Sequence, residues 1–247
     1  MTASLTRRLL AEFLGTGLLV TAVVGSGIAA ARLSPGDVGL QLLENSIATM
    51  LALAVLILVF GPVSGAHLNP VVSLADWWLH RRTGGGLSTR DTAGYVAAQT
   101  VGAVSGAILA NTMYALAPVS WSHTTRSAPH LWLGELVASA GLVLLIFAMV
   151  RTGRTALAAP AVGAYIGAAY WFTSSTSFAN PAVTVGRAFS DTFAGIAAAS
   201  VPAFVAAQLA GAGIGVALLV ALYPRPAVTV PTAGPSPARA QRVWSAR

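Results

Sequence analysis

The sequence predicts an all-α membrane protein in which six transmembrane helices and two re-entrant half-helices form an inverted repeat. Of its 247 residues, 55% are hydrophobic and 9% are charged, and the mean hydropathy is +0.73. A soluble domain carries about 25% charged residues, so this composition indicates a chain that lies largely in lipid. Two Asn-Pro pairs, at 69–70 and 180–181, stand within this hydrophobic chain. These pairs, together with a repeated order of polar residues, predict the rest of the fold.

Six apolar segments are long enough to cross a hydrocarbon core, which takes about 20 helical residues. They cover residues 8–31, 41–61, 92–114, 131–150, 156–173 and 197–222, and the fifth is the shortest. The first is a full-length span with Glu12 inside it, not a cleavable signal peptide. We expect a single domain over 1–222, with repeats at 8–114 and 131–222. The Pro-rich segment 223–247 is expected to be a disordered cytoplasmic tail.

Each Asn-Pro pair predicts a helix that starts in the middle of the membrane. Asn is a strong N-cap because its side-chain oxygen accepts from free backbone N–H groups, and the following Pro has no N–H to leave unpaired. From Asn69 to Leu79 the helix would be about 16 Å long, which is about half of the hydrocarbon core. The two motifs are Asn69-Pro70-Val71 and Asn180-Pro181-Ala182.

The two halves of the chain carry the same polar residues in the same order. Glu12, Asn69 and Gln99 in the first half recur as Glu135, Asn180 and Gln208 in the second. Each half has three spans, an odd number, so the second half enters the membrane in the opposite orientation. The Glu residues are expected to brace the loops by hydrogen bonds, with proton transport as the alternative for a carboxylate in a membrane. The Gln residues lie in Gly/Ala-rich stretches, and we expect them to brace the structure where helices pack closely.

This arrangement predicts a pore for small neutral solutes. The two half-helices meet with the positive ends of their dipoles facing, which repels cations and protons, while the Asn amides can donate to a neutral hydroxylated molecule. The non-helical segments before each motif leave carbonyls unpaired, which is tolerated at membrane depth only along a water-filled path. The expected pore-lining carbonyl loops contain Ala66, His67, Leu68, Ser177, Phe178 and Ala179. His67 is expected to be a structural donor rather than a gate or a metal ligand.

The charges follow the membrane topology. All 14 basic residues are Arg, and eleven of them lie on the side of both termini, so the positive-inside rule makes the termini cytoplasmic. We expect a multi-pass protein of the cell inner (plasma) membrane. The net charge of +7 therefore belongs to loops and does not indicate nucleic-acid binding. The chain has no Cys, no His spacing typical of a zinc site and no nucleophile with a base, so neither a metal, a cofactor nor an enzymatic activity is expected.

The segments Ser-Gly-Ala-His-Leu-Asn-Pro-Val at 64–71 and Phe-Ala-Asn-Pro-Ala-Val at 178–183 resemble the paired signature of the aquaporin and aquaglyceroporin (major intrinsic protein) family. The resemblance covers about residues 8–222. It implies the aquaporin fold, with one pore in each subunit of a homotetramer surrounded by membrane lipid.

The resemblance also assigns the selectivity filter to four positions, which here are Thr49, Ala168, Ser177 and Val183. Water-selective members of the family carry Arg at the last position, with a bulky aromatic and a His at the first two, and this chain has none of them. We therefore expect a wider, less polar constriction without strict water selectivity. Val71, where the family usually has Ala, is expected to perturb packing only.

Arg187 lies four residues after Val183 and has two interpretations. It is expected to pair with Asp191 at helical i,i+4 spacing rather than to act as a displaced filter arginine.

The stretch 180–196 resembles the bacterial branch of the family that is associated with arsenic-resistance operons. That resemblance implies passage of arsenous acid or methylated arsenicals, neutral polyols that are similar to glycerol in shape. A general glycerol/water facilitator is the alternative. An ion-coupled secondary transporter shares inverted repeats and broken helices, but the chain lacks the clustered intramembrane acids that a coupling-ion site needs.

Overall fold

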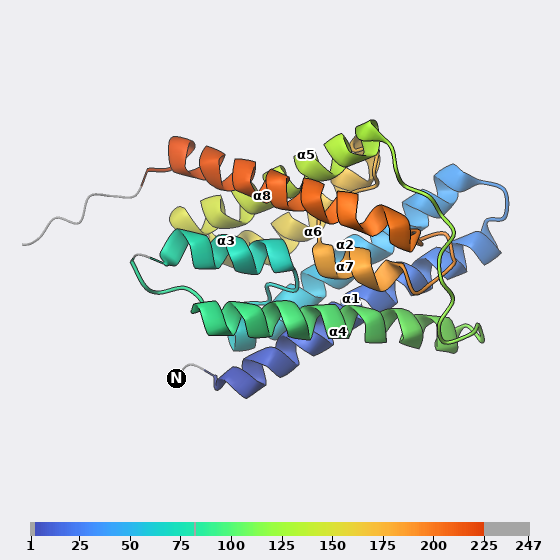
Figure 1. Ribbon diagram of the computed structural model, residues 1–247, viewed down its shortest axis with the longest axis horizontal. Helices are drawn as coiled ribbons and strands as arrows, with labels where there is room; N and C mark the ends of the chain where they lie inside the picture. Colours follow the sequence, from blue (N-terminus) through green and yellow to red (C-terminus); the bar gives the residue numbers. More distant parts are fainter. Residues whose placement is uncertain (1–2, 82, 225–247) are drawn as a thin grey trace, which may run out of the picture.

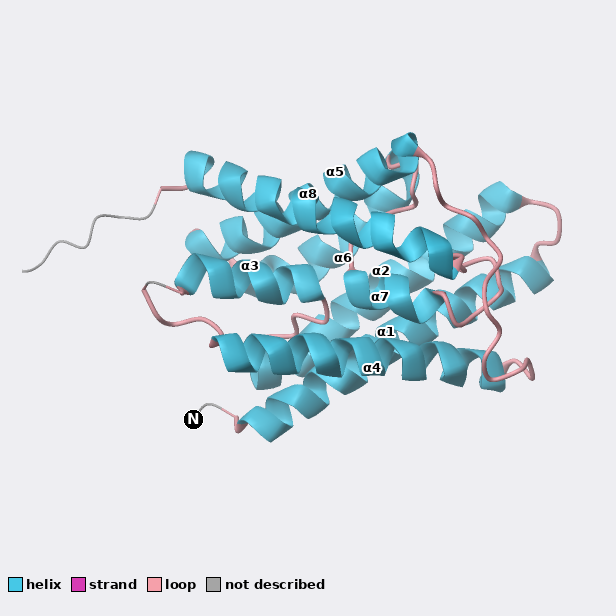
Figure 2. Ribbon diagram, viewed as in Figure 1, coloured by secondary structure: helices cyan, strands magenta, loops and turns pink. Residues whose placement is uncertain are grey.

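The computed structural model describes residues 3–81 and 83–224, and over these ranges the regular structure is helical (Figure 2). Six long helices are α1 (Leu5–Leu33), α2 (Val38–Ser64), α4 (Thr89–Met113), α5 (Pro129–Arg151), α6 (Ala158–Phe172) and α8 (Val201–Leu222). Two short helices are α3 (Pro70–His80) and α7 (Pro181–Arg187), and the turns η1 (Thr155–Leu157) and η2 (Ala198–Ser200) precede α6 and α8. The predicted tail lies outside the described residues from 225 onward.

The observed helices confirm the predicted membrane fold. Five of the described helical segments are long and apolar enough to span a membrane, and α6 is shorter at 15 residues. Several helices begin earlier than the apolar segments, because polar side chains cap them. The Asp37 carboxylate accepts from Leu40 N before α2, and the Ser88 hydroxyl accepts from Asp91 N before α4. Such caps extend helices beyond the hydrophobic pattern.

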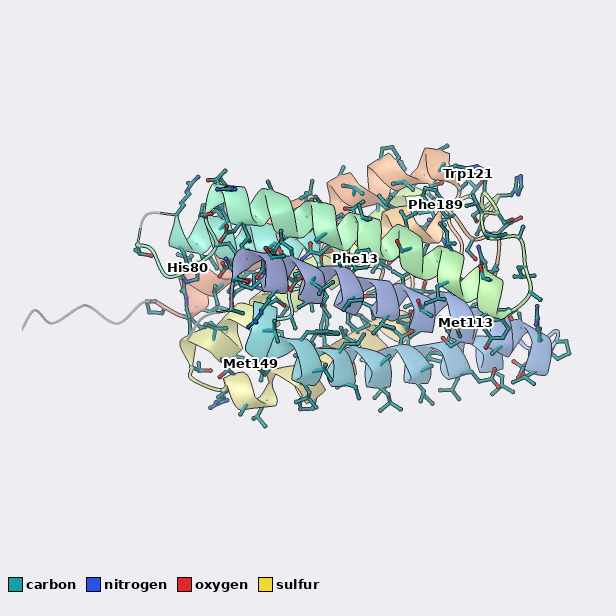
Figure 3. The ribbon with its side chains drawn as sticks, turned by 90° about the horizontal axis from the view of Figure 1, so that it is seen from below. Phe13, His80, Met113, Trp121, Met149 and Phe189 are labelled. Carbon is teal, nitrogen blue, oxygen red and sulfur yellow. The ribbon has the colours of Figure 1, made fainter. Side chains whose placement is uncertain are left out.

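The two half-helices lie end to end between the long helices (Figure 1). In the same view the N-terminus and the end of α8 lie at one end of the molecule, which we call the terminal end. Figure 3 marks the terminal end by His80 and Met149 and the opposite, far end by Met113, Trp121 and Phe189. Helix α3 therefore runs from the middle to the terminal end, and α7 runs from the middle towards the far end.

Glycines allow the closest helix contacts, α1 with α4 and α5 with α8. A Cβ on Gly102 would overlap the carbonyl oxygen of Phe13, and one on Gly211 would overlap that of Leu136. These glycines follow Gln99 and Gln208 by three residues each, so the two halves use the same contact. Small residues let helix backbones approach closely, and the van der Waals contacts that result help to hold helices together in lipid.

A long loop, 115–128, closes the far end against the residues that follow α7. Ser120 N donates to Phe189 O at 3.1 Å, Ser122 N donates to Ala188 O at 3.0 Å, and Ala197 N donates to the Thr124 carbonyl at 2.7 Å. These backbone bonds fix the position of the chain just beyond the end of α7.

Candidate functional site

The two half-helices begin at Asn residues that act as N-caps. Asn69 Oδ1 accepts from Val71 N at 3.0 Å, and Asn180 Oδ1 accepts from Ala182 N and Val183 N at 3.0 and 3.2 Å. Each Asn is followed by the proline that opens the helix. Val71 is fully buried and its N–H keeps the cap bond, so the larger side chain at this position leaves the cap in place.

The Asn side chains also join the two half-helices to each other. Asn69 Nδ2 donates to the Ala179 carbonyl at 2.8 Å, and Asn180 Nδ2 donates to the Leu68 carbonyl, also at 2.8 Å. An amide carries two N–H groups, so each Asn has a second donor left for a solute. The sequence did not reveal these crossed bonds. They engage the Ala179 carbonyl, which we expected in the pore wall, and Ala179 is not among the residues that line the cavity described below.

The loops that precede the half-helices are strained in the same way in both halves. The residues three and one before each Asn have left-handed φ values, which are 46° at Ala66, 49° at Leu68, 49° at Ser177 and 48° at Ala179. Non-glycine residues avoid this region, so such a conformation persists only where surrounding contacts impose it.

The buried carboxylate of Glu12 supplies those contacts in the first half. It accepts from His67 N at 3.0 Å, from Leu68 N at 2.7 Å and from Gln99 Nε2 at 2.7 Å. The His67 ring contacts the Ser73 hydroxyl at 3.1 Å and packs edge-on against Tyr95. Among the described residues, no group of His, Asp and Glu side chains could hold a metal ion.

Glu135 repeats the arrangement in the second half. Its carboxylate accepts from Phe178 N and Ala179 N, each at 2.8 Å, and from Gln208 Nε2 at 2.6 Å. Neither Glu12 nor Glu135 is among the residues that line the cavity. The geometry therefore favours bracing of the loops over proton transport for both carboxylates.

A cavity of about 540 Å³ runs past both Asn residues. On the terminal side it reaches Asp76, Val150 and Thr155, and on the far side it reaches Thr49, Tyr170 and Arg187. The wall between is mostly apolar. Of the six residues expected to contribute carbonyls, Ala66, His67, Leu68, Ser177 and Phe178 lie in the lining.

Three of the four expected filter residues also lie in the cavity lining, namely Thr49, Ser177 and Val183. Ala168 does not, because it is on the exposed face of α6. Tyr170 lines the cavity instead, and its hydroxyl donates to Thr49 Oγ1 at 3.2 Å. Residues two apart in a helix point about 200° apart, so Ala168 and Tyr170 cannot share a face.

The cavity-facing residues of α6 are four apart, at Val162, Ile166 and Tyr170. That spacing in the sequence could have identified the inner face of this helix, whereas counting backwards from Asn180 did not.

The expected pairing of Arg187 with Asp191 is wrong. The Asp191 carboxylate accepts from the backbone N and the Nδ1 of His123 at 3.0 and 2.9 Å, and these hydrogen bonds lower the pKa of Asp191. Helix α7 ends at Arg187, so the next turn that an i,i+4 pair needs does not exist. Arg187 is 3% exposed, lines the cavity, and donates from Nε to the Ala194 carbonyl.

Known proteins resemble this chain in sequence and in fold. The model of the Major intrinsic protein family matches residues 1–178. The aquaglyceroporin AqpS of Rhizobium meliloti (strain 1021) is 51% identical over 215 residues, which are 87% of this chain and 89% of that protein. The glycerol uptake facilitator protein of Pseudomonas aeruginosa is 33% identical over 177 residues, which are 62% of this chain and 60% of that protein.

Among solved structures, the aquaglyceroporin from Plasmodium falciparum superposes with a TM-score of 0.64. The match covers 89% of this chain and 96% of that one at 23% identity, so it shows the fold alone.

Proposed function

This chain belongs to the major intrinsic protein family, and from that premise we propose that its pore passes glycerol-sized solutes and trivalent arsenicals. The protein is a multi-pass membrane channel for small neutral solutes and is not an enzyme. The finer claim concerns the width and chemistry of the constriction.

The observation that carries the proposal is the small apolar Val183 in the cavity lining, three residues after Asn180. With Thr49 and Ser177 it makes a constriction that has no arginine at the family positions. Arsenous acid is a neutral trihydroxy molecule at pH 7 and resembles glycerol in shape. A pore that is wide enough for glycerol and offers Asn donors at its centre suits both solutes.

A general glycerol/water facilitator is the second candidate. The similarity to a glycerol uptake facilitator favours it, and the same cavity would serve it. The two candidates differ only in whether arsenicals cross at a rate comparable to glycerol.

We also propose a homotetramer with both termini in the cytoplasm. Large apolar side chains are exposed on the outer helices, among them Leu51, Val55 and Leu58 on α2, and they need lipid or neighbouring subunits to cover them. The arginines of the terminal end support the cytoplasmic placement of that end.

The test is uptake of arsenite and of glycerol into liposomes that contain the purified protein, against empty liposomes. The proposal predicts protein-dependent entry of both, with arsenite within about tenfold of glycerol. Entry of glycerol without arsenite would leave the general facilitator as the function. A variant with a plugged constriction, Val183→Trp, should abolish both fluxes and so show that they use this pore.

A further inference from the structure

We infer that the Arg187 guanidinium supplies the hydrogen-bond donor of the constriction, although Arg187 does not stand at the family's filter position. With the hydroxyls of Thr49 and Ser177 it forms a solute site. The site fits molecules rich in oxygen acceptors, such as polyols and hydroxylated metalloid acids. The inference rests on the proposed function, because it needs the cavity to be the path of the solute.

The helical geometry of α7 places Arg187 above Val183 on the same face. Four residues turn a helix by about 400° and advance it by about 6 Å, so both side chains point to the cavity. Helical side chains lean towards the start of their helix, so the long Arg side chain extends back over the small Val. Its guanidinium carbon lies 3.4 Å from the ring centroid of Phe178, a residue that precedes α7.

The guanidinium keeps donors free for a solute. Only Nε has a hydrogen-bond partner among the described residues, the carbonyl of Ala194. The two terminal nitrogens have no hydrogen-bond partner among these residues and are not buried, so they face the cavity that Arg187 lines. Asp191 does not neutralise the charge, because its carboxylate is bound by His123. The Phe178 ring offsets part of the cost of holding a cation in this place.

A second observation points to a ligand at the same place. The Ser177 hydroxyl is buried, with the residue 2% exposed, and has no hydrogen-bond partner although Ser177 lines the cavity. Buried hydroxyls without partners are rare and costly in native proteins. Thr49 Oγ1 accepts from Tyr170, which leaves its own hydrogen to donate. A passing solute would therefore meet the guanidinium and the Thr49 hydroxyl on a mostly apolar wall, and the buried Ser177 hydroxyl would gain a partner if its side chain turned towards that solute.

Arg126 offers a matched control. Its Nε donates to the carbonyl of Gly195 at 3.0 Å, next to the carbonyl that Arg187 binds, and its guanidinium carbon lies 5.0 Å from the centroid of the same Phe178 ring. Arg126 is not among the residues that line the cavity. It thus makes the same kind of loop contact without facing the pore.

The first test compares Arg187→Lys with Arg187→Met in proteoliposomes, since Lys and Met are both unbranched and differ in the charged donor. We expect the ratio of glycerol to water permeability in Arg187→Lys to stay within about threefold of the parent. In Arg187→Met the ratio should fall about tenfold, which corresponds to the free energy of one charge-assisted hydrogen bond. Arg126→Lys and Arg126→Met should give equal ratios. Equal ratios for the two Arg187 variants would overturn the inference. A parent that does not pass glycerol at all would instead reject the proposed function.

The second test uses the absence of cysteine from the chain. In Arg187→Cys, the thiolate attacks the sulfenyl sulfur of aminoethyl methanethiosulfonate, a mixed disulfide forms and methanesulfinate leaves. We expect this adduct to give a glycerol-to-water ratio about tenfold above that of the equally large, neutral propyl adduct, and the two adducts of Arg126→Cys to give the same ratio. If mass spectrometry detects no adduct on the folded Arg187→Cys variant, position 187 is closed to the pore and the inference fails.

Discussion

A guanidinium placed at position 183 would meet the one that Arg187 already presents. The two positions are four residues apart on one face of α7, or about 6 Å along the helix. At an effective dielectric constant of about 20, two unit charges at about 6 Å repel by about 3 kcal/mol. We therefore expect Val183→Arg to lower the stability of the folded channel by up to that amount, and to narrow the pore so that glycerol flux falls much further than water flux.

The double variant Val183→Arg/Arg187→Met removes the repulsion and keeps one guanidinium. It should recover most of the lost thermal stability while the ratio of glycerol to water permeability stays low. The assays are thermal unfolding in detergent and stopped-flow light scattering in liposomes, normalised to the amount of assembled protein. If Val183→Arg is as stable and as permeable to glycerol as the parent, position 183 does not face the constriction. A double variant that is less stable than Val183→Arg would refute the charge argument.

Three further perturbations test other parts of the structure. Asn180→Asp puts a carboxylate against the two positive helix ends, so cation leak measured with a voltage-sensitive dye should rise; an assembled variant as cation-tight as the parent would contradict the dipole barrier. Ala168 lies on the exposed face of α6, so Ala168→Trp should leave glycerol flux within about twofold of the parent, whereas Tyr170→Trp adds bulk inside the cavity and should reduce glycerol flux. A larger loss of flux in Ala168→Trp than in Tyr170→Trp would restore the family assignment of Ala168 to the filter. The pKa of Asp191 in the folded state lies below its ordinary value of 3.8, so the stability that its carboxylate contributes is present above that value and is lost as the pH falls through the lowered pKa. The difference in Tm between the parent and Asp191→Asn should therefore shrink as the pH falls below that value, and a difference that does not shrink would contradict the assignment.

The sequence predicted the membrane fold because its main signals are local. Long apolar segments specify spans, and Asn followed by Pro specifies where a helix starts. The internal repeat supplied the opposed orientation of the halves. It also explains why the contacts of Glu12 and Glu135 could be anticipated as a pair: each follows from one position in a repeated unit.

The errors and omissions arose where the answer depends on tertiary register. The inner face of α6 is set by how that helix rotates against its neighbours, so Tyr170 rather than Ala168 faces the cavity. The pairing of Arg187 with Asp191 assumed a helix that continues, but α7 ends at Arg187. In the loops, Asp191 binds His123 and Arg187 binds the Ala194 carbonyl instead. The crossed Asn bonds join residues 110 and 112 positions apart, and no local pattern encodes such a contact.

The central claim is that two opposed half-helices make a path for neutral solutes that excludes charge. The most direct measurement records glycerol entry and voltage-driven proton flux in the same batch of proteoliposomes. We predict protein-dependent glycerol entry with a proton conductance no greater than that of empty liposomes. Protein-dependent proton flux comparable to that of a proton channel, or the absence of glycerol entry into liposomes with correctly assembled protein, would contradict the account.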